Sequence, residues 1–159
     1  DRYHPLADSY DPAFMRYGVI KEGLDIEEQL NRLGLFTVTF SCKPFRYSLA
    51  GNEPVTLAAS GGVLHNPYPF ISRPYIRIEG SGSGTLTLQS AGNNGTWTFS
   101  EIDGYVEIDS EQMNFYKATQ LKNQTVTGEG FPLLYPGENV LACSGGITGL
   151  AVTPRWCCI

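Results

Sequence analysis

The sequence predicts an all-β protein whose main domain is an antiparallel β-sandwich, preceded by part of a second β domain. The chain of 159 residues contains 18 glycines and 10 prolines, which interrupt regular elements and favour turns. Short runs rich in β-branched and aromatic residues lie between these turn residues, as expected of many short strands. Helical periodicity is confined to one short segment.

The first clear strand is predicted at residues 35–42, which alternate in polarity and place Phe40 and Cys42 on the apolar face of a half-buried strand. Residues 75–90 are typical of two strands joined by a turn. The glycines and serines of residues 80–84 are expected to form a flexible hairpin loop between them.

Two further turns between strands are predicted toward the C-terminus. Residues 96–109 are expected to form a hairpin around Asp103-Gly104, a pair that tolerates positive φ. Gly145-Gly146 is expected to separate two apolar runs, at residues 140–143 and 150–153.

One segment could form a helix. Asp25 and Glu28 have the spacing of a capping box, and Ile26, Leu30 and Leu33 fall on one side of the helix. Because so short a helix is marginal without packing, an ordered loop with one helical turn is an equal alternative.

A domain boundary is predicted near residues 44–54, which contain two prolines, a turn-type Gly51-Asn52 and no periodicity. The hairpin-rich region that follows has the size of a complete β-sandwich. We therefore expect residues 1–47 to be the end of one domain and residues 48–159 to be all of another.

Composition disfavours several classes of partner. The formal net charge is −5, so binding to nucleic acid lacks the Lys and Arg excess that phosphate contacts need. No stretch reaches the 18 or more apolar residues typical of a membrane-spanning helix, so we expect no membrane insertion. The four cysteines form no C-x-x-C pair and predict reduced, packed thiols of a protein made in a reducing cytoplasm.

Asp109 and Glu111 end an alternating run and could be a catalytic carboxylate pair, a metal site or a polar turn. On a continuing strand they would lie roughly 7 Å apart, between the spacings of retaining and inverting glycosidases. The turn requires only that Asp109 bind nearby backbone amides. We favour the turn, and predict no catalytic residues.

Other chemistry has little support in the sequence. His4 and His65 are the two histidines, and neither lies near a nucleophile motif such as G-x-S-x-G. No calcium loop of the D-x-D-x-D-G type is present, so we expect no metal site and no cofactor.

Sugar binding is a further possibility, because β-sandwiches often stack an aromatic ring under a saccharide and read its hydroxyls with polar side chains. The same residues could instead contact a protein partner. The candidates are Trp97, Tyr105, Tyr116, His65 and Asn66.

Four motifs in order resemble the siphophage distal tail protein family, known as Dit. GLFTVTFSCKPFRY (residues 34–47) resembles its G-x-F-x-V-x-F-x-C-x-P-x-x-Y stretch. NPYPFISRPYIRIEGSG (66–82) resembles N-x-G-x-x-x-S-x-P-x-I-x-I-x-G-x-G, with Tyr68 in place of the usual Gly. VEIDSEQMNFY (106–116) contains its I-D-S-E, and residues 131–156 match F-P-x-L-x-P-G-x-N and the closing P-R-W.

The resemblance implies a galectin-like or jelly-roll-like C-terminal sandwich and an N-terminal β domain that forms a hexameric ring. Residues 1–47 would be the last part of that ring domain, so we expect this chain alone to be monomeric or weakly associated. It also implies a non-enzymatic virion protein of a phage or prophage tail tip, made in the bacterial host cytoplasm. Its expected partners are itself, the tail tube protein, a tail-associated lysin or fibre protein, and receptor-binding proteins.

The main alternative is a carbohydrate-binding β-sandwich module that contacts a host saccharide. A glycosidase using Asp109 and Glu111 is a third and more distant possibility.

Overall fold

The computed structural model describes residues 2–21, 38–92 and 94–159, whose regular structure is almost entirely antiparallel β-sheet. The predicted all-β class is confirmed. The small sheet has the strand order β1-β2-β3-β12. Its strands are β1 (His4–Ala7), β2 (Phe14–Ile20), β3 (Phe40–Ser48) and β12 (Cys157–Cys158).

The large sheet follows the order β4-β11-β6-β7-β8-β9, with β5 paired to β11 and β10 paired to β7. Its strands are β4 (Val55–Leu57), β5 (Gly61–Asn66), β6 (Tyr75–Ser90), β7 (Asn94–Asp109), β8 (Asn114–Lys117), β9 (Gln120–Leu121), β10 (Val126–Gly128) and β11 (Gly137–Thr153). Two 3₁₀ turns, η1 (Ala50–Asn52) and η2 (Asn123–Thr125), are the helical elements of the described residues.

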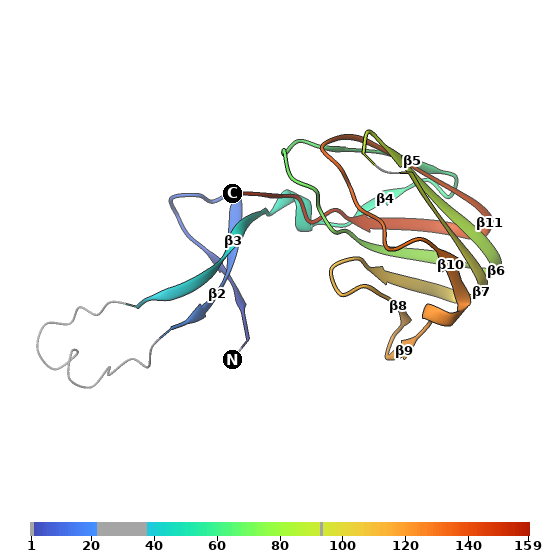
Figure 1. Cartoon of the computed structure of the whole chain (residues 1–159), viewed down its shortest axis with the longest axis horizontal. Coiled ribbons are helices and arrows are strands. Elements are labelled where there is room, and N and C mark those ends of the chain that lie inside the picture. Colours follow the sequence, from blue (N-terminus) through green and yellow to red (C-terminus); the bar gives the residue numbers. More distant parts are fainter. Residues whose placement is uncertain (1, 22–37, 93) are drawn as a thin grey trace, which may run out of the picture.

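Three long strands, β6, β7 and β11, make the large sheet into a sandwich. Figure 1 shows each of them turning back at the right of the molecule, so that its two halves face one another. The three predicted breaks are therefore wrong. Residues 80–84, Asp103-Gly104 and Gly145-Gly146 all lie inside continuous strands.

Glycine allows these strands to bend without ending. A Cβ atom on Gly146 would overlap the carbonyl oxygen of Ser81, and one on Gly80 would overlap the carbonyl oxygen of Gly146. The register between β11 and β6 shifts at the same level, between Gly145 and Ile147. Bulges and glycines bend a strand and keep its pairing on either side, which a glycine-rich sequence alone does not distinguish from a hairpin loop.

The two halves of each long strand belong to different layers. The first half of β6 pairs with the second halves of β7 and β11, and its second half pairs with their first halves. β4 and β8 widen one layer, and β5 and β10 widen the other. Alternate side chains from both layers meet in one core, which includes Ile76, Ile78, Leu86, Leu88, Trp97, Phe99, Val106, Ile108, Leu141, Leu150 and Val152.

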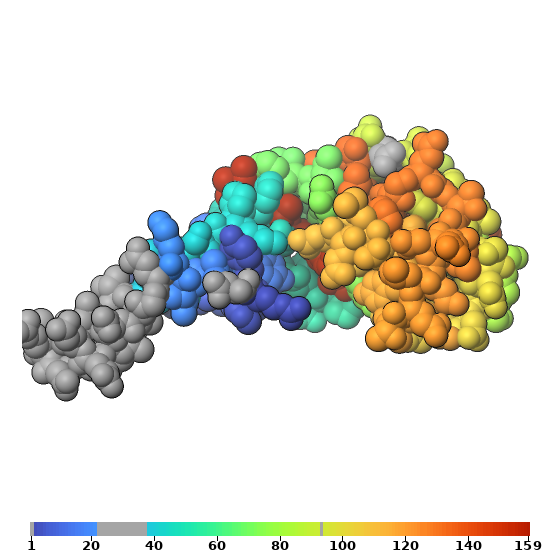
Figure 2. Space-filling model, turned by 60° about the horizontal axis from the view of Figure 1, so that its bottom comes forward, coloured from blue at the N-terminus to red at the C-terminus, as the bar shows by residue number. Residues whose placement is uncertain are grey.

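The small sheet stands beside the sandwich and buries few of its side chains (Figure 2). Ile20 and Phe40 pair across β2 and β3 and are 51% and 43% exposed. The predicted burial of Phe40 and Cys42 is therefore wrong, because no second layer covers that face in the described part of the chain. The described strand also runs on to Ser48, through the segment that we expected to be irregular.

Both ends of the chain contribute to the small sheet. In β12, Cys157 lies opposite Tyr47 of β3 and Cys158 lies opposite Arg46. The division into residues 1–47 and 48–159 stays a prediction, and this pairing adds the last strand to the first of the two parts. The segment of the predicted helix, with Asp25 and Glu28, lies outside the described residues.

All four cysteines are unpaired, in keeping with the predicted reduced thiols. Cys157 is buried with its Sγ 3.7 Å from the carbonyl oxygen of Ile71, whereas Cys42 is exposed on β3. Burial raises the pKa of the half-buried Cys143 thiol to about 11, which disfavours the reactive thiolate at neutral pH.

The bend predicts a strong effect of one added methyl group. Gly146→Ala places a Cβ against the Ser81 carbonyl and should lower the free energy of unfolding by about 3 kcal/mol, the scale of an overpacked site. Gly149→Ala on the same strand is the matched control, since its Cβ meets the Glu79 side chain at 3.3 Å and that side chain can move. Urea unfolding of both variants measures the difference, and equal midpoints would contradict the role assigned to Gly146.

Candidate functional site

The junction between the small sheet and the sandwich is the candidate functional site, because four of the motif segments meet there. Two chain segments cross it side by side: β3 leads into η1, and β11 leads through residues 154–156 into β12 (Figure 1). The Ser48 amide donates to the Trp156 carbonyl at 2.9 Å, and the Arg155 amide donates to the Gly51 carbonyl at 2.6 Å.

Trp156 anchors this crossing in the sandwich. Its side chain is 8% exposed and belongs to the core cluster. The crossing is so close that a Cβ atom on Gly51 would lie 2.6 Å from the Trp156 backbone nitrogen. Glycine is therefore required at residue 51, and the small sheet is tied directly to the core of the sandwich.

A second pair of motifs forms the opposite wall of the junction. Ser72 and Leu134 exchange two backbone hydrogen bonds, each of 3.0 Å. Leu134 is fully buried, while the neighbouring residues Ile71, Arg73 and Leu133 line the junction. The alternation of side chains along extended backbone explains this division.

Two buried asparagines fix the loops that carry this wall. The Asn66 side chain accepts from the Tyr68 amide at 3.0 Å and donates to the Phe70 carbonyl at 2.9 Å. Asn139 accepts from the Tyr135 amide and donates to the Tyr135 carbonyl, both at 2.8 Å. Each side-chain amide thus stabilises a local turn, and its donor and acceptor groups are engaged by backbone atoms.

Asp109 is a structural carboxylate at this junction. Its two oxygens accept from the Arg155 guanidinium at 2.8 and 3.1 Å, and Oδ1 also accepts from the amides of Glu111 and Gln112 at 3.0 and 3.1 Å. Burial alone would raise the pKa of Asp109, but the hydrogen bonds from Arg155 and the two amides outweigh it and hold the pKa below its ordinary value. The polar turn predicted at residues 109–111 is present.

Arg155 holds an unusual backbone conformation at the same place. Its φ is 56°, in the left-handed region that costs a non-glycine residue about 1–2 kcal/mol. The bidentate pair with Asp109 and the hydrogen bond to Gly51 hold the residue in this conformation. Backbone strain of this kind persists where the surroundings over-determine the residue, as they do here.

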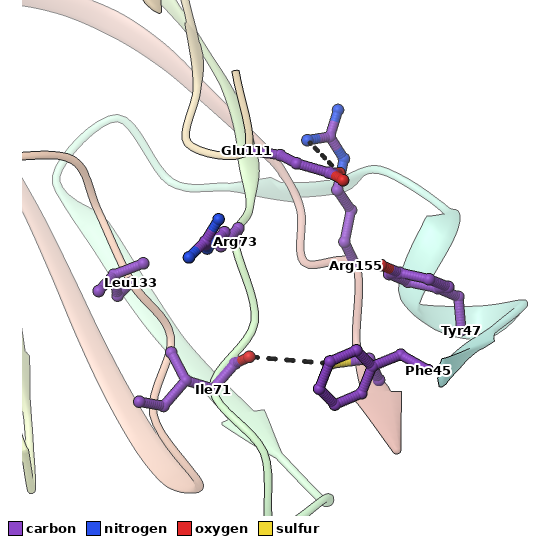
Figure 3. Close-up of a pocket in the computed structure, with 8 residues that line it drawn as sticks. Phe45, Tyr47, Ile71, Arg73, Glu111, Leu133 and Arg155 are labelled. Carbon is purple, nitrogen blue, oxygen red and sulfur yellow. Dashed lines mark hydrogen bonds and ion pairs between the residues drawn. The ribbon is translucent and has the colours of Figure 1, made fainter. Parts of the chain in front are cut away.

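A cavity of about 370 Å³ lies between the two sheets at this junction (Figure 3). Glu111 at its rim lies 3.8 Å from both Lys43 of β3 and Arg155, so a chain of ion pairs crosses from the small sheet to the sandwich. The lining residues are Phe45, Tyr47, Ile71, Arg73, Glu111, Leu133, Arg155 and Cys157.

The five predicted sugar or partner contacts are not brought together. Trp97 is 1% exposed and its indole nitrogen donates to the Gly130 carbonyl, and Asn66 is 2% exposed, so neither side chain offers surface to a ligand. His65 is exposed on β5, on the other layer from Tyr105 and Tyr116. A contact through His65, Tyr105 or Tyr116 stays a prediction.

Tyr105 and Tyr116 lie on the outer face of the sandwich around Glu107. Tyr116 pairs with Glu107 across β7 and β8, and the Arg77 guanidinium covers the Tyr105 ring at 4.0 Å from its centroid. Arg77 also lies 3.7 Å from Glu107. The Tyr105 face on which a sugar would stack is therefore already occupied by a cation.

Sequence reasoning missed the two arginines of the junction. Arg155 was noticed only as part of the P-R-W motif, since its left-handed φ and its partner 46 residues earlier have no local signature. Arg73 lies in the S-R-P segment, and only the Ser72–Leu134 bridge shows that it faces the junction.

Both carboxylates of this site have cationic neighbours. Asp109 is paired with Arg155 at 2.8 Å, and the more exposed Glu111 lies 3.8 Å from the same guanidinium. No group of three or more His, Cys, Asp or Glu side chains that could hold a metal ion occurs in the described ranges. Within the same ranges, no helix has the length and apolar character needed to cross a membrane.

The chain matches no family model, and it matches no curated protein sequence. Among solved structures it is similar to the crystal structure of SPP1 Dit (gp 19.1), a paradigm of the hub adsorption apparatus in phages that infect Gram-positive bacteria. The TM-score is 0.62 at 15% sequence identity, over 96% of this chain and 64% of that chain. The chain thus spans 64% of the SPP1 protein's length, and the likeness establishes the antiparallel β-sandwich fold.

Substitution of Asp109 should measurably lower the free energy of unfolding, because it breaks the pair with Arg155. As a turn cap alone, Asp109 would contribute on the order of 1 kcal/mol. Because Asp109→Asn also leaves the partly buried Arg155 without its anion, we expect a loss of about 3 kcal/mol in the free energy of unfolding. Glu111→Gln, whose side chain is 43% exposed, should cost less than about 1 kcal/mol, and urea unfolding compares the two.

The same pair makes the free energy of unfolding depend on pH. The folded-state pKa of Asp109 is depressed, so its contribution to stability is present above the unfolded-state value of about 3.9 and is lost as pH falls through the folded value. The difference between wild type and Asp109→Asn should be constant at neutral pH and shrink below about pH 4. A difference that stays constant into strong acid would contradict the ion pair.

Proposed function

We propose that this protein is a structural component of a phage tail tip, similar in role to the hub adsorption protein whose fold it shares. The observation that carries this proposal is the shared arrangement over 96% of the chain, which includes both the small sheet and the sandwich. A free-standing binding module requires only the sandwich. A second sheet fixed to it through Arg155, Trp156 and Gly51 suits a protein that must hold two parts of an assembly together.

The proposed role is architectural and non-enzymatic. Support comes from the junction, where the carboxylates that could have served as a catalytic pair bind Arg155 and backbone amides. The motifs that suggested the role are likewise turns, clamps and close approaches between strands. The unpaired cysteines fit synthesis in the reducing cytoplasm of a bacterial host, followed by assembly into a virion.

The small sheet is the proposed site of assembly with further copies. Ile20 and Phe40 form an exposed apolar pair on the face that no second layer covers in the described part of the chain, and Tyr3 is 47% exposed beside β1. An apolar patch on a sheet of this kind is typical of a surface that becomes buried in an assembly. We propose a homohexameric ring as the complete protein's state, with the tail tube, a tail-associated lysin or fibre protein and receptor-binding proteins as its neighbours.

Immunogold labelling tests the location. Antibody raised against the 159-residue chain is applied to intact particles of the phage that encodes it, and electron microscopy locates the gold. We expect label at the tail tip, at the end away from the capsid. Label on the capsid or along the tail shaft would contradict the proposal. An unlabelled tail tip would also contradict it if mass spectrometry shows that the particles contain the protein and the tips have been opened to the antibody.

Ile20→Asp tests the assembly surface. Because Ile20 is 51% exposed, the variant should fold, but an unpaired carboxylate buried between copies should prevent assembly. Val63→Asp is the matched control, since Val63 is 56% exposed on β5 of the sandwich. In a phage lacking the gene, the control should restore complete tails and Ile20→Asp should not. If both variants restore complete tails equally well, the small sheet is not part of the assembly interface.

A further inference from the structure

The junction cavity has an unpaired cation in its wall. Arg73 lines the cavity and makes no hydrogen bond, ion pair or ring contact with any described residue. The other guanidinium in the wall, Arg155, is bound to Asp109, and the nearby Lys43 of β3 lies 3.8 Å from Glu111. A guanidinium is the side chain best suited to bind a carboxylate through two parallel hydrogen bonds, so Arg73 is a ready anion site.

The remaining walls of the cavity are largely apolar. Phe45 and Tyr47 of β3 lie on one side, with the Phe45 ring held edge-on against Phe70 at 5.5 Å between centroids. Ile71 and Leu133 lie on the other side, and Figure 3 shows Arg73 between them and Arg155. A saccharide would need several convergent donors and acceptors, whereas Phe45, Ile71 and Leu133 present apolar surface and Arg155 is already bound to Asp109.

The cavity is open, and its size fits one or two side chains. Ile71 is 43% exposed, Arg73 is exposed, and the Glu111 side chain is 43% exposed at the rim. Glu111 and the chain's net charge of −5 would repel a strongly acidic ligand. A ligand that carries a single carboxylate beside an apolar group complements both the free cation and the apolar walls.

We propose that the junction cavity binds an apolar segment of a partner protein that carries one carboxylate side chain. Arg73 binds the carboxylate, and Phe45, Tyr47, Ile71 and Leu133 contact the neighbouring apolar side chain. The site lies between the small sheet and the sandwich, so a bound segment touches both parts. This inference goes beyond the tail-tip role and does not depend on it.

Peptide titrations followed by NMR of the ¹⁵N-labelled chain test the site. The probes are acetyl-Leu-Glu-Phe-amide and its neutral counterpart acetyl-Leu-Gln-Phe-amide, with phenylacetate as a small carboxylate. We expect saturable shifts of the Tyr47, Ile71, Arg73 and Leu133 amides with the Glu peptide, at a dissociation constant in the millimolar range. The Gln peptide should bind about tenfold more weakly.

Substitutions measure separately how the Arg73 charge and the apolar walls contribute to peptide affinity. Arg73→Gln should reduce affinity for the Glu peptide about tenfold and remove the preference over the Gln peptide, and Arg73→Lys should restore part of it. Ile71→Ala should weaken both peptides. Arg16→Gln is the matched control. Arg16 is exposed on β2 away from the cavity lining, its side chain makes no hydrogen bond, ion pair or ring contact with a described residue, and its substitution should leave binding unchanged.

Three outcomes would overturn the proposal. Equal affinity for the Glu and Gln peptides would show that Arg73 does not distinguish a carboxylate from a neutral amide. Shifts confined to another surface would place the binding elsewhere. Binding of phenylacetate without binding of the Glu peptide would make the cavity a small-molecule site. Because Arg73 and Ile71 are exposed, the variants should keep the dispersed spectrum of the folded chain, which the same experiment verifies.

Discussion

The crossing of two chain segments at the junction holds the two sheets in one arrangement. Trp156 is packed in the sandwich core, the Arg155 amide is bonded to Gly51, and the Arg155 guanidinium is bound to Asp109. These contacts fix the point at which the last strand leaves the sandwich and joins β3. The small sheet buries few side chains, and its other contacts with the sandwich include ring contacts such as Phe45–Phe70 and the ion pair Lys43–Glu111, so it depends strongly on this crossing.

Close backbone approach is the second constraint, and it shapes the sandwich. Gly80 and Gly146 allow β6 and β11 to bend against each other, and the bend brings the two halves of each long strand face to face. One core then serves both layers. The sandwich and the junction thus depend on the same device, a glycine placed where another backbone leaves no room for a Cβ atom.

The sequence was sufficient for the class and for local motifs, and insufficient for long-range geometry. The sequence placed extended structure at residues 75–90 and 96–109, which β6 and β7 occupy. The I-D-S-E segment was correctly predicted as a turn because Asp109 caps the amides that follow it. The continuous paths of β6, β7 and β11 were missed, because a glycine at a bend and a glycine at a hairpin loop look alike in sequence. Trp97 was a candidate contact because of its aromatic ring, although its alternation with Phe99 already indicated a core or interface position, and both side chains lie in the core.

We propose that this chain is a scaffold that joins two parts of a tail tip through the junction between its two sheets. The most direct measurement is a cryo-electron microscopy reconstruction of the tail tip of the phage that encodes the chain. We predict density that fits both the small sheet and the sandwich in their present arrangement, with the small sheets of neighbouring copies in contact around the tail axis. A tail tip whose density is fully explained by other proteins, with no place for this fold, would contradict the account.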